Sequence, residues 1–119
     1  MRDDKENLIV KLTFEFALKI IEYTEELRSL KKFEMASQLF NSGTSVGANT
    51  REAQNAESRA DFIHKFKVAA KEADETEYWL KLCKASDFYP DPKDDLFTEL
   101  KAIIKILSKI LSTSKKQKN

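Results

Sequence analysis

The chain has 119 residues and contains only two glycines and two prolines. Average usage of about 7% and 5% would give roughly fourteen, so turn-rich architectures such as β-sandwiches and barrels are nearly excluded. Charged residues make up 34% and hydrophobic residues 41% of the chain, which fits helices with one apolar and one polar face. The formal net charge of +1 favours neither nucleic acid nor membrane as a partner of the whole chain.

The ends and the cysteine content indicate a compartment. Residues 1–7 are mostly charged and lead into a patterned helix, so a secretory signal is not expected. No apolar run approaches the ~18 residues of a transmembrane helix. Cys83 is the only cysteine and can form neither an intrachain disulfide nor, alone, a zinc site. We expect a cytoplasmic protein without membrane association.

Apolar spacing of three and four residues predicts a first helix over about 5–29, capped by Asp3 or Asp4. A second pattern predicts a helix over 33–56 that contains both glycines, Gly43 and Gly47. Because each interior glycine costs about 1 kcal/mol relative to alanine, a loop over 41–45 between two short helices is the alternative. The i, i+4 spacing of the glycines favours the continuous helix, since it places both on one face.

Two more helices follow. Ser58 and Asp61 form a weak capping box before a helix over 59–86. Asp91 and Pro92 read as N-cap and first residue of a fourth helix over 92–112, and 113–119 are expected to form a disordered basic tail.

Four helices with short connections predict an all-α fold, an antiparallel up-down four-helix bundle over 1–112. The apolar stripes of the first and fourth helices are broad, and Phe14 and Ile21 widen the first one. Surplus apolar surface of this kind favours self-association.

A seam of small residues is expected between the second and third helices. A turn near Glu57 would bring small side chains of both helices together and allow a close approach. The predicted seam consists of Ser42, Gly43, Ser45 and Gly47 facing Ala69, Ala70 and Ala73. A phosphate-binding loop is a weaker interpretation of the same stretch, because the lysine and the preceding strand of a P-loop are missing.

Several segments together resemble one family. The run 38–49, residues 52–53, Ser58, the run 61–65 and the run 71–80 resemble the bacterial four-helix-bundle proteins encoded in intervening sequences of 23S ribosomal RNA genes, which often carry a ribosomal-protein label. The resemblance implies an all-α bundle, a homo-oligomer that is a pentamer in related proteins, and no established catalytic activity.

The chain is also similar to the accessory proteins of diversity-generating retroelements, which are basic pentameric barrels that bind a reverse transcriptase and nucleic acid. It departs from them in its net charge of only +1.

Polar and aromatic residues of the second and third helices are candidates for an oligomer interface or a polar network. We expect an ion pair between Lys71 and Glu75 and another between Glu52 and Lys65, and we expect Trp79 in the core or an interface, with base stacking by Tyr78 and Trp79 as the alternative. The candidate set is Asn49, Glu52, Lys65, Lys71, Glu72, Glu75, Tyr78 and Trp79.

No metal or other cofactor is expected. A di-metal bundle needs two Glu-x-x-His pairs, but His64 is the only histidine and we expect it at the surface. Cys83 is expected to be a small buried hydrophobe.

Lysines gather near the C-terminus, with only Glu99 to oppose them after residue 96. They are either a solvated face near a helix C-terminus or a stripe for sequence-independent contact with phosphates. The candidate nucleic-acid contacts are Lys101, Lys105, Lys109, Lys115, Lys116 and Lys118.

The sequence thus predicts a non-enzymatic homo-oligomer that binds or scaffolds a partner, RNA or a nucleic-acid-handling protein. The alternative is a purely structural protein–protein interaction module without nucleic-acid binding, and a metal-dependent hydrolase or oxidase is a third option.

Overall fold

The structure, a computed structural model, describes residues 4–116. These residues form four helices: α1 (Asp4–Ser29), α2 (Phe33–Ala53), α3 (Arg59–Ala85) and α4 (Asp94–Lys116). No strand occurs within 4–116, so the predicted all-α class is confirmed. None of the helices in this range is long and apolar enough to cross a membrane.

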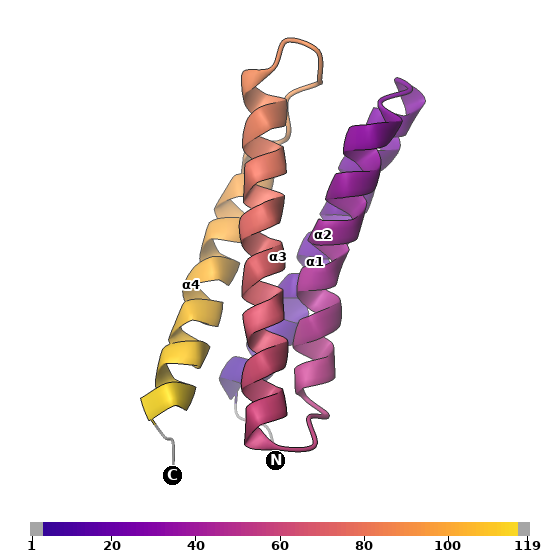
Figure 1. The fold of residues 1–119 in the computed structure, drawn as a ribbon. Helices are drawn as coiled ribbons and strands as arrows, with labels where there is room; N and C mark the ends of the chain where they lie inside the picture. Colours follow the sequence, from indigo (N-terminus) through magenta and orange to yellow (C-terminus); the bar gives the residue numbers. More distant parts are fainter. Residues whose placement is uncertain (1–3, 117–119) are drawn as a thin grey trace.

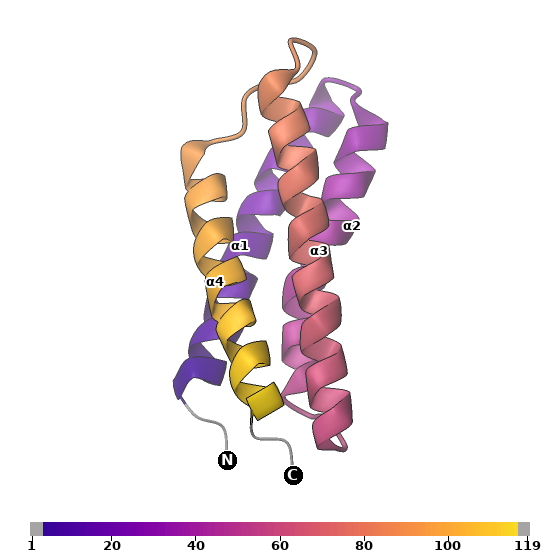
Figure 2. The ribbon, with the colours of Figure 1, turned by 60° about the vertical axis from the view of Figure 1, so that its left-hand side comes forward.

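The helices lie side by side in chain order, and α4 returns to pack against α1 (Figures 1 and 2). Contacts run in opposite directions along neighbouring helices. A Cβ on Gly43 would touch Ile20, and one on Gly47, further along α2, would touch Thr13, earlier in α1. Arg59 at the start of α3 donates to the Ser114 carbonyl near the end of α4 at 3.2 Å, and Lys65 near the start of α3 pairs with Glu52 near the end of α2. This register is compatible with an antiparallel up-down arrangement.

The core runs the length of the bundle and receives side chains from all four helices. Within each helix its largest fully buried members are separated by three, four, seven or fourteen residues, which places them on one side of the helix as the apolar spacing predicts. They include Ile9, Phe16, Ile20, Leu27, Leu39, Val46, Phe66, Leu80, Leu100, Ile103 and Leu107.

Polar groups at the boundary of α1 and α4 reinforce their packing. Lys19 of α1 forms ion pairs with Asp95 and Glu99 of α4, and the two carboxylates raise the pKa of Lys19. The Tyr23 hydroxyl donates to the Pro90 carbonyl at 2.7 Å. Tyr23 therefore attaches the α3–α4 connection to α1.

The second helix is continuous through both glycines, and neither has a positive φ. The loop alternative over 41–45 is therefore wrong. The helix ends at Ala53, three residues earlier than predicted, and residues 54–58 form the turn to α3. At the end of α1, Lys31 takes the left-handed φ of 62° that a tight reversal requires.

Two predicted boundaries of α4 are wrong. The helix begins at Asp94, so Asp91 and Pro92 precede it, and Pro92 is buried. It also continues to Lys116, because the Arg59 contact holds Ser114 in a buried last turn. Residues 117–119 of the predicted disordered tail, and Asp3 of the predicted α1 cap, lie outside the described residues.

Ser58 caps α3 as predicted, since its hydroxyl accepts from the Asp61 N–H at 3.0 Å.

Candidate functional site

The glycines lie at the boundary of α1 and α2. A Cβ added at Gly43 would lie 2.8 Å from Ile20 Cγ1, and one at Gly47 would lie 3.2 Å from the Thr13 carbonyl oxygen. The prediction that both glycines face the alanines of α3 is therefore wrong. Successive helical residues differ by about 100° in direction, so Ser42 faces α3 while Gly43 faces α1.

The remaining small residues do lie between α2 and α3. Ser42, Ala69 and Ala73 are buried, whereas Ser45 and Ala70 are only partly buried. The Ser42 and Thr76 hydroxyls are 2.9 Å apart and hydrogen-bonded. Sequence reasoning missed Thr76 as a polar member of the seam, although its place one turn after Ala73 is a usable signal.

The expected polar network over α2 and α3 forms only in part. Lys65 Nζ lies 2.8 Å from Glu52 Oε1, as predicted, and the Glu52 carboxylate raises the pKa of Lys65. The predicted ion pair between Lys71 and Glu75 does not form among the described residues. Glu75 instead accepts from the Trp79 indole N–H at 3.2 Å, because Trp79 lies one turn further along the same face.

Asn49 and Glu72, two further members of the candidate set, interact with residues of their own helices. The Asn49 amide donates to the Ser45 carbonyl of its own helix at 2.9 Å. Partial burial, together with repulsion from Glu75, raises the pKa of Glu72, and Lys71 opposes this shift. The Glu72 carboxyl is therefore held in a setting that disfavours its charge.

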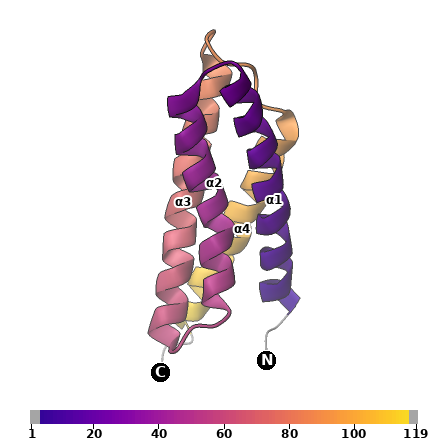
Figure 3. The ribbon, with the colours of Figure 1, turned by 90° about the vertical axis from the view of Figure 1, so that its right-hand side faces the viewer.

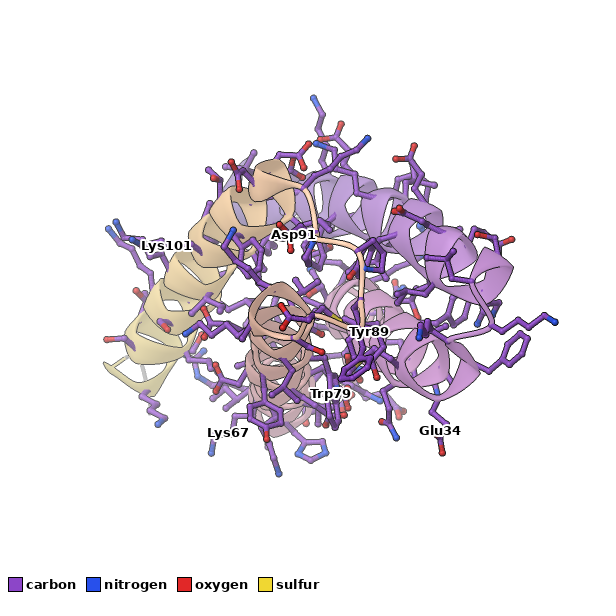
Figure 4. All side chains as sticks on the ribbon, turned by 90° about the horizontal axis from the view of Figure 1, so that it is seen from above. Glu34, Lys67, Trp79, Tyr89, Asp91 and Lys101 are labelled. Carbon is purple, nitrogen blue, oxygen red and sulfur yellow. The ribbon has the colours of Figure 1, made fainter. Side chains whose placement is uncertain are left out.

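The two neighbouring aromatic residues of α3 differ in burial. Trp79 is half-buried and packs against the core, while Tyr78 is 58% exposed. Their rings meet edge to face with centroids 5.3 Å apart. Figure 4 shows Trp79 beside α3, on the side toward α2. Trp79 thus belongs largely to the bundle, and Tyr78 is available to a partner.

Several lysines of α3 and α4 form no ion pair with any described residue. The contacts of Arg59 with Ser114 and of Lys84 with Asp94 set the register, which brings Lys71 to about the level of Lys105. Figure 4 shows Lys67 on α3 and Lys101 on α4, both projecting away from the bundle. We call this set the α3–α4 lysine face: Lys67, Lys71, Lys101, Lys105, Lys109 and Lys115, all exposed.

Sequence reasoning missed Lys67 and Lys71 as part of this face, because only the register of α3 against α4 relates them to the α4 lysines. Of the other predicted contacts, Lys116 ends α4 but its side chain lies outside the described part of the chain, as does Lys118.

Three large apolar side chains of α1, spaced four and three residues apart, form an exposed row. Phe14 is 63% exposed, Leu18 50% and Ile21 37%. They are exposed, unlike the buried Ile9, Phe16 and Ile20 of the same helix. Figure 3 shows α1 with α2 beside it. The predicted surplus of apolar surface on the first helix is confirmed.

The described residues contain no group of three or more histidine, cysteine, aspartate or glutamate side chains that could hold a metal ion. Asp61 instead accepts from the Glu57 N–H at 3.2 Å, and His64 is exposed as predicted. Cys83 is buried, also as predicted, and burial raises the pKa of its thiol.

Comparison with known proteins identifies the family. The family model for the 23S rRNA-intervening sequence protein matches residues 5–113, which span all but the ends of the bundle. The chain belongs to the 23S rRNA-intervening sequence protein family.

A solved structure agrees with this membership. A protein of unknown function from the S23 ribosomal protein family of Bacteroides thetaiotaomicron is 40% identical, with a TM-score of 0.85 over 91% of this chain and 98% of that chain. No curated protein matches significantly. In this 23S rRNA-intervening sequence family protein, the segments that carried the resemblance lie on α2 and α3, where the small-residue seam and the Glu52–Lys65 pair are found.

Proposed function

We propose that this family member is an antiparallel up-down four-helix bundle that self-associates in the cytoplasm and acts, without catalysis, as a binding scaffold for RNA or a nucleic-acid-handling protein. The resemblance stated above implies five copies per assembly. Retroelement accessory proteins, to which the chain is similar, provide the model for such a scaffold.

The observation that carries the proposal is the α3–α4 lysine face. Its six lysines have no ion pair within the described residues and project from two adjacent helices, so a long phosphate backbone that crosses both helices can contact several of them. Positive charge of this kind contacts phosphates without reading bases. The exposed Asp74 shares the side of α3 that carries Lys67 and Lys71, seven and three residues away, whereas Glu77 pairs with Lys81 and Asp94 with Lys84. The six lysines therefore outnumber the carboxylates of this face.

Self-association would strengthen a weak contact. Several copies of the lysine face in one assembly raise the effective concentration for a long polyanion, so that avidity exceeds the affinity of one copy. Such binding decreases steeply with salt, because counterions are released when lysines neutralise phosphates.

The test is a titration of labelled single-stranded RNA at 50 and 200 mM salt. We expect Lys101→Glu/Lys105→Glu to weaken binding at least tenfold at low salt, and Lys31→Glu/Lys93→Glu, with the same change of charge outside the face, to weaken it much less. Equal loss in both variants would mean that only net charge matters and would contradict a defined face. Charge reversal is preferable to truncation at 113, which would remove Ser114 from its Arg59 contact.

A protein–protein scaffold without nucleic acid is the second candidate. The exposed Tyr78 of α3 favours it, because an aromatic side chain suits a protein partner better than a phosphate backbone. Absence of RNA binding at both salt concentrations, in a protein that still self-associates, would select this alternative.

A further inference from the structure

The apolar row on α1 belongs to a longer pattern on the exposed side of that helix. Lys11, Phe14, Leu18, Ile21 and Glu25 follow one another at spacings of three, four, three and four residues. This is the repeat of a helix that pairs with another helix along a narrow seam. All five positions are exposed, so the intramolecular core does not account for the pattern.

Charge at the ends of the pattern selects the partner and its direction. The row has a lysine at its N-terminal end, a glutamate at its C-terminal end and only apolar residues between. If two copies of α1 met in parallel, Lys11 would oppose Lys11 and Glu25 would oppose Glu25. If they met antiparallel, each Lys11 would oppose the other copy's Glu25, and Leu18 would lie at the two-fold axis.

We propose that α1 forms an antiparallel two-fold contact with α1 of a second copy, centred on Leu18, with Phe14 packed against Ile21 and Lys11 paired with Glu25 across the contact. This deepens the self-association proposed above and depends on it. A two-fold contact uses the same patch on both copies, whereas a five-membered ring uses two different patches. The α1 contact therefore joins two chains, or two rings, and is separate from any ring interface.

The residues that flank the row on the side toward α2 are compatible with this contact. Toward α2, α1 presents half-buried Val10 and Ala17, and α2 presents half-buried Thr44 and Gly47. Small side chains there leave room for the larger ones of a second copy. On the other flank, Glu15 and Glu22 are exposed, so the contact leans toward α2 and leaves these carboxylates at a solvated rim, where salt screens their repulsion.

Within one copy, Glu25 already meets Arg28 at 3.2 Å. The Glu25 side chain is 68% exposed in that pair, and its second oxygen can accept from a lysine of another chain. Arg28 therefore orients the carboxylate and leaves it accessible.

Charge exchange tests the proposal. Lys11→Glu and Glu25→Lys each replace both opposite-charge contacts by like-charge contacts, so each single variant is expected to raise the dissociation constant about tenfold. The double variant Lys11→Glu/Glu25→Lys restores opposite charges and is expected to return to within about threefold of the original. An equimolar mixture of the two single variants should form mixed pairs. Sedimentation velocity over a range of concentrations measures the dissociation constant of the two single variants, the double variant and the mixture. Glu57→Lys in the α2–α3 turn is the matched control.

A second variant tests the direction of pairing. Leu18→Cys places a thiol at the proposed axis, while the native Cys83 is buried. A short bis-maleimide should join two Leu18→Cys chains efficiently. It should join few Lys11→Cys chains, because position 11 of one copy lies next to position 11 of the other only in a parallel pair.

The outcomes separate this inference from the proposed function. A wild-type chain that sediments as a 13.7 kDa monomer at all concentrations overturns self-association and the α1 contact together. An oligomer whose stability is the same in the single and double variants overturns the α1 contact alone and leaves self-association standing. Weaker self-association in the single variants, with recovery in the double variant, supports the two-fold contact.

Discussion

A hydrogen bond of 2.9 Å joins the hydroxyls of Ser42 on α2 and Thr76 on α3 in the buried seam between these helices. Both residues are almost completely buried. Thr76 Oγ1 also lies 2.7 Å from the Glu72 carbonyl oxygen, so the two hydroxyls can satisfy one another and the backbone. The bond fixes the register of α2 against α3 at a point where the surrounding contacts are apolar.

Loss of this bond should be costly. Thr76→Val keeps the shape of the side chain but leaves the Ser42 hydroxyl without its partner, and we expect the free energy of unfolding to fall by about 1–3 kcal/mol. Urea denaturation measures the change. Thr98→Val, at an exposed position of α4, should change stability by less than about 0.5 kcal/mol. In the double variant Ser42→Ala/Thr76→Val the cost should be less than the sum of the single costs, and strict additivity would contradict the coupling.

Gly43 should resist substitution although alanine is the better helix former. The gain in helix propensity is about 1 kcal/mol, but the new Cβ would lie 2.8 Å from Ile20, which is fully buried and branched at Cβ. We expect Gly43→Ala to lower the free energy of unfolding by about 1–3 kcal/mol through overpacking. In an Ile20→Ala background the same change should be neutral or stabilising. Equal effects in both backgrounds would show that Ile20 is not the obstacle.

Ala73 provides the matching test on the other side of α2. It is fully buried in α3, and Ala73→Leu should overpack the boundary and cost about 1–3 kcal/mol. Thermal unfolding measures the change, with Ala102→Leu at an exposed position of α4 as the control. An unchanged melting midpoint for Ala73→Leu would contradict close packing in this seam.

The fold followed from the sequence because its signals are local. Periodicity defines a helix within its own residues, so four helices and their buried stripes could be predicted closely. The ends of α2 and α4 could not. The Arg59–Ser114 contact stabilises the last turn of α4 across 55 residues of chain, and no pattern near Ser114 reports it.

The candidate site was less predictable, because it too depends on contacts between residues that are distant in the sequence. Placing Gly43 against α1 requires the rotation of α2 between two neighbours, which the spacing of two glycines leaves open. The Glu52–Lys65 pair was predictable because a short turn joins their helices. Lys71 failed to pair with Glu75 because Trp79, one turn away, offers Glu75 an indole donor, and sequence spacing alone does not rank such competitors.

Glu72 should make stability depend on pH. Partial burial and the nearby Glu75 raise its pKa in the folded protein above the ordinary value of 4.5. The folded state therefore binds this proton more tightly than the unfolded state, so the associated stability is present below the ordinary pKa and is lost as the pH rises through the folded-state pKa. Glu72→Gln stays neutral throughout and escapes this loss. We expect its melting temperature to exceed that of the wild type at pH 7.5, and the difference to shrink as the pH falls toward 4. Glu57→Gln, at an exposed turn position, should show a smaller change between the two pH values. A difference for Glu72→Gln that is constant or grows on acidification would contradict a desolvated Glu72 carboxyl.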